Sequence, residues 1–224
     1  MIKKAIKKIF CLTLTVAVFS STSLQALAAT YSPEAQIEQK QVELSQKISQ
    51  ILDGDYGNLT IENTTIKLDL NYIKNNNIDV SSKEFEQGII NEVTVYKDKI
   101  EDSLLTNQYN AKLTSRASAA STSLTGTYER TASVWCGVPA IGWAYINQDY
   151  NVTIKNGYFQ SVEFLGDSYK SGIALGSWTP IRSWYELAPY KTYVNINMKG
   201  VLDYSLKSGI ISSTETFLYI DGQG

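Results

Sequence analysis

The sequence predicts an α+β protein, with a helical N-terminal segment followed by an antiparallel all-β C-terminal domain, a β-sandwich or small barrel of about six strands. Three observations support this prediction. Apolar residues recur at helical spacing as far as residue 104, residues 114–124 are small and polar, and apolar and polar residues alternate from residue 125 onward. All four Trp and ten of the 15 Tyr also follow residue 124.

The first 28 residues have the features of a secretory signal peptide. Four lysines between Lys3 and Lys8 precede a short apolar run, and Ala26-Leu27-Ala28 fits a small-x-small cleavage site. The run is shorter than the roughly 20 residues needed to span a bilayer. We therefore expect cleavage after Ala28, a secreted (extracellular) protein of a Gram-positive type, and no membrane span.

The charge balance argues against some partners. Residues 1–28 contain four of the 20 basic residues and none of the 22 acidic ones, so the predicted mature chain is more acidic than the formal −2 of the whole. A protein that neutralises phosphates needs a clustered excess of Lys and Arg. The sequence therefore indicates no nucleic acid partner.

Residues 29–113 contain two amphipathic helical patterns. The first begins at Ser32-Pro33, with Ser as the N-cap and Pro at the first helical position, and has Ile37, Leu44 and Ile48 on one stripe. Residues 60–70 alternate loosely, which indicates a short strand or hairpin. The second helix follows a capping box with Ser81 at the N-cap and Glu84 at the third helical position.

The second helix presents its apolar residues on one face. Their spacings of 3 and 4 place six side chains on a single stripe: Phe85, Ile89, Val93, Tyr96, Ile100 and Leu104. Such a stripe packs either against the chain's own core or against a second copy. The second option predicts a self-associating surface or matrix protein.

The Ser/Ala/Thr linker at residues 114–124 has no periodicity and contains Arg116, a candidate protease site. As a plain tether it joins the helical region to the domain at 125–224. Alternatively, residues 29–116 are a removable pro-segment, which predicts a secreted toxin or antimicrobial protein.

The C-terminal domain contains six candidate strands. They cover about 127–136, 142–155, 158–166, 176–186, 191–206 and 210–220. Asn156-Gly157 favours a two-residue hairpin turn that sets Lys155 opposite Tyr158 and, further along, Val152 opposite Ser161. In the strand at 191–206, Tyr193, Asn195, Asn197 and Lys199 point away from the apolar face, and Gly200 indicates a bulge or bend.

A Pro/Gly corner connects the first two of these strands. It is formed by Trp135, Cys136, Gly137, Pro139, Gly142 and Trp143. Because Cys11 lies in the predicted signal peptide, Cys136 has no partner for an intramolecular disulfide and is expected to be a small buried hydrophobe. The corner is therefore expected to reverse the chain, with Trp135 and Trp143 packed around Cys136.

The sequence does not predict an enzyme. It contains no histidine, which excludes Ser-His-Asp and Cys-His catalysis and the His-containing zinc sites. Carboxylates such as Asp149 and Glu163 are scattered without a pattern that pairs them, and the spacing of Asp167, Asp203 and Asp221 does not define a calcium site. No cofactor and no metal are indicated.

The aromatic residues favour recognition. Trp and Tyr combine a large apolar face with a polar edge, which suits stacking on sugar rings and anchoring protein interfaces. Around Pro180, which restricts its segment to an edge strand or loop, lie the candidate ligand-binding residues Trp178, Arg182, Trp184 and Tyr185. The sequence thus predicts a non-catalytic binding module for a cell-wall or extracellular glycan, or for a protein at the cell surface.

Overall fold

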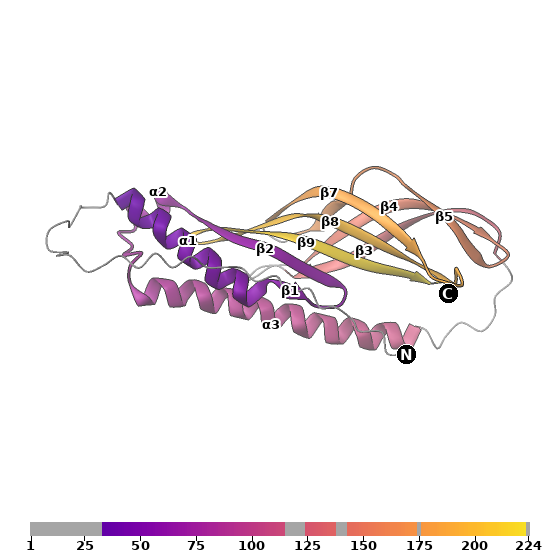
Figure 1. Ribbon diagram of the computed structural model, residues 1–224, viewed down its shortest axis with the longest axis horizontal. Coiled ribbons are helices and arrows are strands. Elements are labelled where there is room, and N and C mark those ends of the chain that lie inside the picture. Colours follow the sequence, from indigo (N-terminus) through magenta and orange to yellow (C-terminus); the bar gives the residue numbers. More distant parts are fainter. Residues whose placement is uncertain (1–32, 115–123, 138–142, 174–175, 223–224) are drawn as a thin grey trace, which may run out of the picture. The chain divides into compact units, whose positions relative to one another are not determined.

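The structure is a computed structural model that describes residues 33–114, 124–137, 143–173 and 176–222 (Figure 1). It confirms the α+β prediction, because a helical N-terminal region precedes antiparallel strands arranged in two sheets. The predicted signal peptide, nearly all of the linker, and Pro139 and Gly142 of the corner lie outside the described residues. None of the described helices is long and apolar enough to cross a membrane.

The N-terminal region contains α1 (Pro33–Leu52), β1 (Gly54–Asp55), β2 (Leu59–Leu68), α2 (Leu70–Asn75) and α3 (Lys83–Thr114). The C-terminal region contains β3 (Gly126–Gly137), β4 (Trp143–Lys155), β5 (Tyr158–Phe164), β6 (Tyr169–Gly172), β7 (Gly176–Leu187), β8 (Tyr193–Leu206) and β9 (Gly209–Gly222). All six predicted strands of the C-terminal region are present, and β6 was not predicted.

The strands form two sheets. The larger has the order β1-β2-β9-β8-β7, and the smaller has the order β3-β4-β5 with β6 also paired to β4. The strand that the sequence indicated at 60–70 is β2, and it pairs with β9 from Leu59↔Phe217 to Leu68↔Gly209. The N-terminal region and the C-terminal domain therefore share one sheet.

Helix α1 caps the edge of β2 that faces away from β9. Backbone N–H groups of Leu68 and Ile66 donate to Gln41 Oε1 and Ser45 Oγ at 3.0 and 3.1 Å, and the N–H of Thr64 donates to Asp53. Four residues of a helix rise about 6 Å, and two residues of a strand rise about 6.8 Å. Side chains four residues apart on α1 therefore match the spacing of every second backbone N–H group on β2. The edge is thereby closed to further strand pairing.

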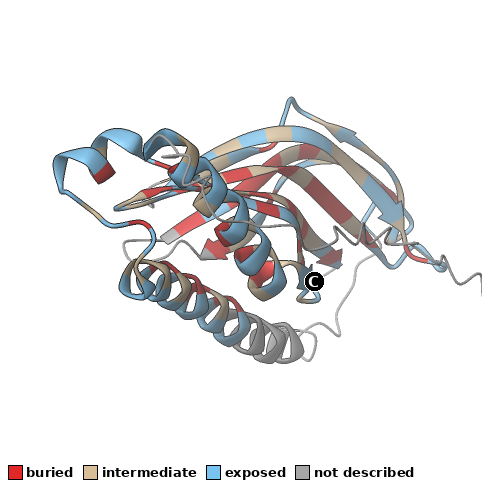
Figure 2. Ribbon diagram, turned by 60° about the vertical axis from the view of Figure 1, so that its left-hand side comes forward, coloured by how far each residue is buried: buried red, intermediate tan, exposed pale blue. Residues whose placement is uncertain are grey.

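The apolar stripes of both helices are buried in the core, as Figure 2 shows. Buried positions on α1 are Ile37, Leu44, Ile48 and Leu52, and those on α3 are Ile89, Val93, Tyr96 and Ile100, with Phe85 packed at the margin. The side chain of Leu104 lies outside the described residues. Because this stripe packs inside the chain, the prediction that it forms a self-association seam is wrong for this fold.

The start of α3 differs from the predicted capping box by one residue. The hydroxyl of Ser82, not Ser81, accepts the N–H of Phe85 at 3.1 Å. Ser81 instead donates its hydroxyl to Asp79 at 2.6 Å. Because Ser81 donates both its N–H and its hydroxyl to Asp79 Oδ1, it belongs to the preceding turn, and Ser82 becomes the N-cap.

Polar contacts fasten the smaller sheet to the larger one. The carboxylate of Asp221 on β9 is buried and accepts from Arg130 Nη1 on β3 and from the Tyr150 hydroxyl on β4, both at 2.6 Å. Ser183 on β7 donates to Gln148 Oε1 on β4 at 2.6 Å. These groups hold the two sheets at a fixed spacing, with the apolar core between them.

The hairpin at Asn156-Gly157 is present, but its predicted register holds only next to the turn. Lys155 lies opposite Tyr158 as expected, whereas Val152 lies opposite Val162 and not Ser161. A bulge shifts the register between Thr153 and Ile154. The shift brings an apolar side chain of β5 opposite the buried Val152, which is the physical reason for it.

Candidate functional site

Strand β7 carries all four predicted ligand-binding residues and lies at the edge of the larger sheet. Pro180 lacks a backbone N–H and is therefore expected on an edge strand or in a loop, and β7 is an edge strand. The strand has two faces. One faces the core and the smaller sheet, and the other, which we call the open face, carries the side chains that alternate outward.

A bulge at Ile181 decides which β7 residues reach the open face. Pro180 pairs with Gly200 and Arg182 with Lys199, so Ile181 is the extra residue. With uninterrupted alternation, Arg182 would lie opposite Met198, whose side chain is fully buried. The bulge instead turns Arg182 and Trp184 outward.

Trp178 belongs to the core-facing side. Its ring packs edge-on against Phe217 with 5.6 Å between ring centroids, and its Nε1 donates to Ser168 Oγ at 3.0 Å. A Cβ on Gly200 would lie 2.5 Å from Trp178 Cζ2, so the glycine makes room for the indole. The bulge that the sequence indicated at Gly200 lies in the partner strand, one residue beyond Pro180.

Tyr185 also turns toward the smaller sheet. Its ring makes an edge contact with Phe164 at 6.4 Å between centroids, and the residue is 37% exposed. The structure thus separates the predicted cluster into Trp178 and Tyr185 on one face of β7 and Arg182 and Trp184 on the other.

Arg182 and Trp184 interact on the open face. The guanidinium carbon of Arg182 lies 4.6 Å from the centroid of the Trp184 ring, a cation–π contact. The indole Nε1 of Trp184 points to Glu186 Oε1 at 3.3 Å. Both polar ends of this group are exposed, while the indole is half-buried.

The neighbouring strands extend this surface. Trp184 lies opposite Asn197, which lies opposite Leu218, and Glu186 lies opposite Asn195, which lies opposite Ile220. Tyr193 continues the row along β8 and is 39% exposed, and Ile220 is 54% exposed. The alternation in the sequence predicted that Tyr193, Asn195 and Asn197 point outward. It could not predict that they lie beside Trp184, because that depends on the pairing of β7 with β8.

Asn195 has an unusual feature. Its Oδ1 is buried and has no hydrogen-bond partner among the described residues. Leaving a buried acceptor unpaired costs about 1–3 kcal/mol, so such an atom needs an explanation. Its side chain lies on the open face in the row from Asn197, opposite Trp184, to Tyr193, and a bound hydroxyl group reaches this oxygen only when the amide turns outward.

A small pocket adjoins the same edge of β7. It has a volume of about 300 Å³ and is lined by Phe164, Gly166, Asp167, Ser168, Pro180, Arg182 and Ser183. Gln148 donates from Nε2 to the Gly166 carbonyl at 3.0 Å, and Trp178 fixes Ser168. The walls are therefore held in place before any ligand binds.

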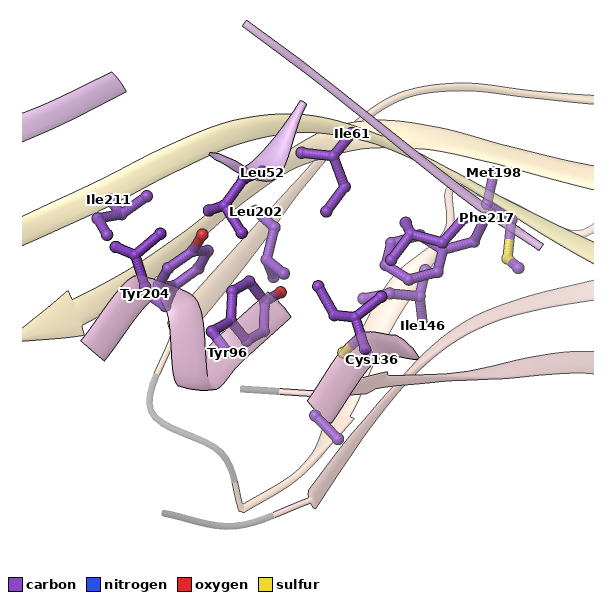
Figure 3. Packing of buried hydrophobic residues seen from close by; sticks show 14 of the residues in the cluster. Leu52, Ile61, Tyr96, Cys136, Ile146, Met198, Leu202, Tyr204, Ile211 and Phe217 are labelled. Carbon is purple, nitrogen blue, oxygen red and sulfur yellow. The ribbon is translucent and has the colours of Figure 1, made fainter. Parts of the chain in front are cut away.

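The predicted corner lies between β3 and β4, and its described ends, Gly137 and Trp143, form the last pair of these two strands. Cys136 is buried in the core (Figure 3), and burial raises the pKa of its thiol to about 12. Trp135 does not pack around it, because consecutive strand residues face opposite ways and Trp135 lies opposite Tyr145. The side chain of Trp143 lies outside the described residues.

A larger groove, of about 870 Å³, lies between α1, β2 and the β8–β9 turn, with Ile37, Leu68 and Leu206 among its lining residues. Two of its polar side chains, Gln41 and Ser45, already accept the edge N–H groups of β2. We place the candidate site at β7, where the Arg182 guanidinium is held by an aromatic ring and the Asn195 Oδ1 accepts no hydrogen bond from the described residues.

Within the described part of the chain, no group of three or more Cys, Asp and Glu side chains is arranged to hold a metal ion. No family model matches the sequence, and no curated protein or solved structure is significantly similar to it. The open face and the adjoining pocket are therefore the features of this chain that bear on its function.

Proposed function

We propose that this chain is a non-catalytic binding module for an extracellular glycan, and that the glycan lies on the open face across Trp184, Asn195 and Tyr193. The observation that carries the proposal is the row of side chains from Trp184 to Tyr193 on the open face, with the unsatisfied amide of Asn195 between the two aromatic rings. A sugar ring offers both complements, an apolar C–H face for the aromatic rings and hydroxyl donors for the amide oxygen.

The dimensions suit a chain of sugars. Trp184 on β7 lies opposite Asn197 on β8. Tyr193 is four residues from Asn197 along β8, about 14 Å away at 3.4 Å per residue. Asn195 lies midway between them. A ligand that spans the platform therefore contacts an aromatic ring at each end and an amide at its centre.

Binding of polysaccharides is the direct test. Retention on insoluble polysaccharides, followed by titration of soluble oligosaccharides with tryptophan fluorescence, compares the wild type with Trp184→Ala. We expect the loss of the indole to weaken binding at least tenfold, about 1.4 kcal/mol. The matched control is Trp135→Ala, a half-buried tryptophan on the smaller sheet, which leaves the open face intact.

Asn195→Leu separates a binding role from a structural one. Leu is close in size and removes the unpaired acceptor, so we expect the free chain to become more stable while glycan binding weakens. A variant that is less stable and binds normally would show that Asn195 serves the fold. The proposed function would be refuted if the wild type were retained on none of the polysaccharides, or if Trp184→Ala bound them as tightly as the wild type.

A further inference from the structure

Arg182 is exposed on the edge strand β7, and its guanidinium forms no ion pair with a carboxylate within the described part of the chain. Two positive groups elsewhere on the two sheets are paired, among them the cross-strand neighbour of Arg182. Arg130 binds Asp221 at 2.6 Å, and Lys199, the cross-strand neighbour of Arg182, binds Glu62 at 2.9 Å. Arg182 is instead held by the Trp184 ring, which leaves its hydrogen-bond donors free for a ligand.

The position of Arg182 links two surfaces. It lines the pocket beside Asp167 and Ser168, and it lies next to Trp184 on the open face. The bulge at Ile181 creates this position by shifting Arg182 away from the core side. A molecule bound on the platform can therefore place one substituent in the pocket.

The pocket combines one cation and one anion that are not paired with each other. Asp167 is exposed and makes no ion pair with Arg182 among the described contacts. A guanidinium binds a carboxylate through two parallel hydrogen bonds, and a carboxylate accepts hydrogen bonds from hydroxyl groups. A group that satisfies both carries a carboxylate and neighbouring hydroxyls.

We infer that the ligand is an acidic polysaccharide, whose sugar carboxylate binds Arg182 while adjacent hydroxyls donate to Asp167. This inference rests on the proposed function and adds the chemical class of the glycan. Arg182 is then the residue that determines specificity, whereas Trp184 serves neutral and acidic sugars alike. Free carboxylate on an acidic peptide shares the charge but lacks the hydroxyls.

The test compares ligands that differ in charge alone. Polygalacturonate and its methyl-esterified form share a backbone and differ in charge. The panel also compares two other acidic polysaccharides, alginate and hyaluronate, with neutral glucans and chitin oligomers. We expect carboxylated members to bind at least tenfold more tightly than neutral ones and to weaken as salt is added. Arg182→Gln should remove this difference, and Arg182→Lys should retain part of it, because lysine keeps the charge without the planar fork.

Two further arms complete the design. Lys207→Gln removes an exposed positive charge from the β8–β9 turn and should leave every affinity unchanged. Asp167→Asn should weaken binding of acidic sugars relative to polyglutamate, because the relief of repulsion is common to both anions while only the sugar loses the stronger hydroxyl acceptor.

The outcomes are distinct. Neutral glycans that bind as tightly as acidic ones, with Arg182→Gln unchanged, would overturn this inference and leave the proposed function standing. Polyglutamate that binds as tightly as the acidic sugars would also overturn it, since charge alone would then suffice. Binding to no member of the panel would refute both.

Discussion

The carboxyl group of Glu215 makes the stability of this fold depend on pH. It is fully buried on β9, its Oε1 accepts the Ser213 hydroxyl at 2.7 Å, and its Oε2 has no partner among the described residues. Burial, the dominant cause, raises its pKa from the ordinary 4.5 to about 8. The surrounding groups, Tyr96 on α3 and Cys136 on β3 (Figure 3), have pKa values raised by burial and further by Glu215.

The sign follows from the two pKa values. Below pH 4.5 the carboxyl is protonated in both states and carries no penalty. Between pH 4.5 and 8 the unfolded chain releases the proton while the folded chain retains it, so stability falls as pH rises. At about 1.4 kcal/mol per unit, the loss is roughly 3 kcal/mol at pH 7 and approaches about 5 kcal/mol above pH 8.

Glu215→Gln removes this titration and keeps the acceptor for Ser213. Urea denaturation from pH 4 to pH 9 should show a variant similar to the wild type at pH 4 and more stable by about 3 kcal/mol at pH 7. Glu163→Gln, an exposed carboxyl on β5, is the matched control and should give a curve parallel to the wild type. A wild type whose stability rises between pH 5 and 8, or a Gln variant that is destabilised equally at every pH, would refute the reasoning.

Three other predictions follow from the core and the sheet. The Cys136 thiol, with its pKa near 12, should resist iodoacetamide at pH 8 until denaturant is added, and rapid labelling of the folded chain would contradict its burial. Cleavage at a protease site engineered into residues 115–123 should leave two fragments that elute together until denaturant is added, because β2 pairs with β9. A C-terminal fragment that elutes alone and keeps the circular dichroism spectrum of the intact protein would contradict this pairing. Deletion of Ile181 removes the extra, exposed residue and leaves Arg182 opposite Lys199, so urea denaturation should show a loss below about 1 kcal/mol, and a loss of several kcal/mol would contradict the bulge.

Local patterns in the sequence predicted the elements well. The strand expected at 176–186 is Gly176–Leu187, the one at 210–220 is Gly209–Gly222, and α1 begins at Pro33. These patterns report which residues are buried within one element, but not which element covers them. The pairing of β2 with β9 joins Thr65 to Ser212, far apart in the chain, and neither strand alone indicates it.

The candidate site shows the same limit at the scale of single residues. Sequence proximity grouped Trp178, Arg182, Trp184 and Tyr185, whereas the structure divides them between two faces because one extra residue reverses the alternation. Asn195 and its unpaired oxygen were not singled out, since an asparagine on a wet face is ordinary until the neighbouring strands show that it is buried.

The bulges nonetheless leave a trace that the sequence contains. In β5 the core-facing apolar residues change from odd to even positions, from Phe159 to Val162 and Phe164, and in β7 they change from Trp178 to Tyr185 and Leu187. A change of parity inside one strand means that a residue has been inserted into the ladder, because side chains otherwise alternate strictly. Trp184 keeps the earlier parity after the change, which places a large aromatic ring outward. A tryptophan out of phase with the apolar residues that follow it is therefore a sequence signal for an exposed aromatic platform, and here it points to the same strand as the unpaired Arg182.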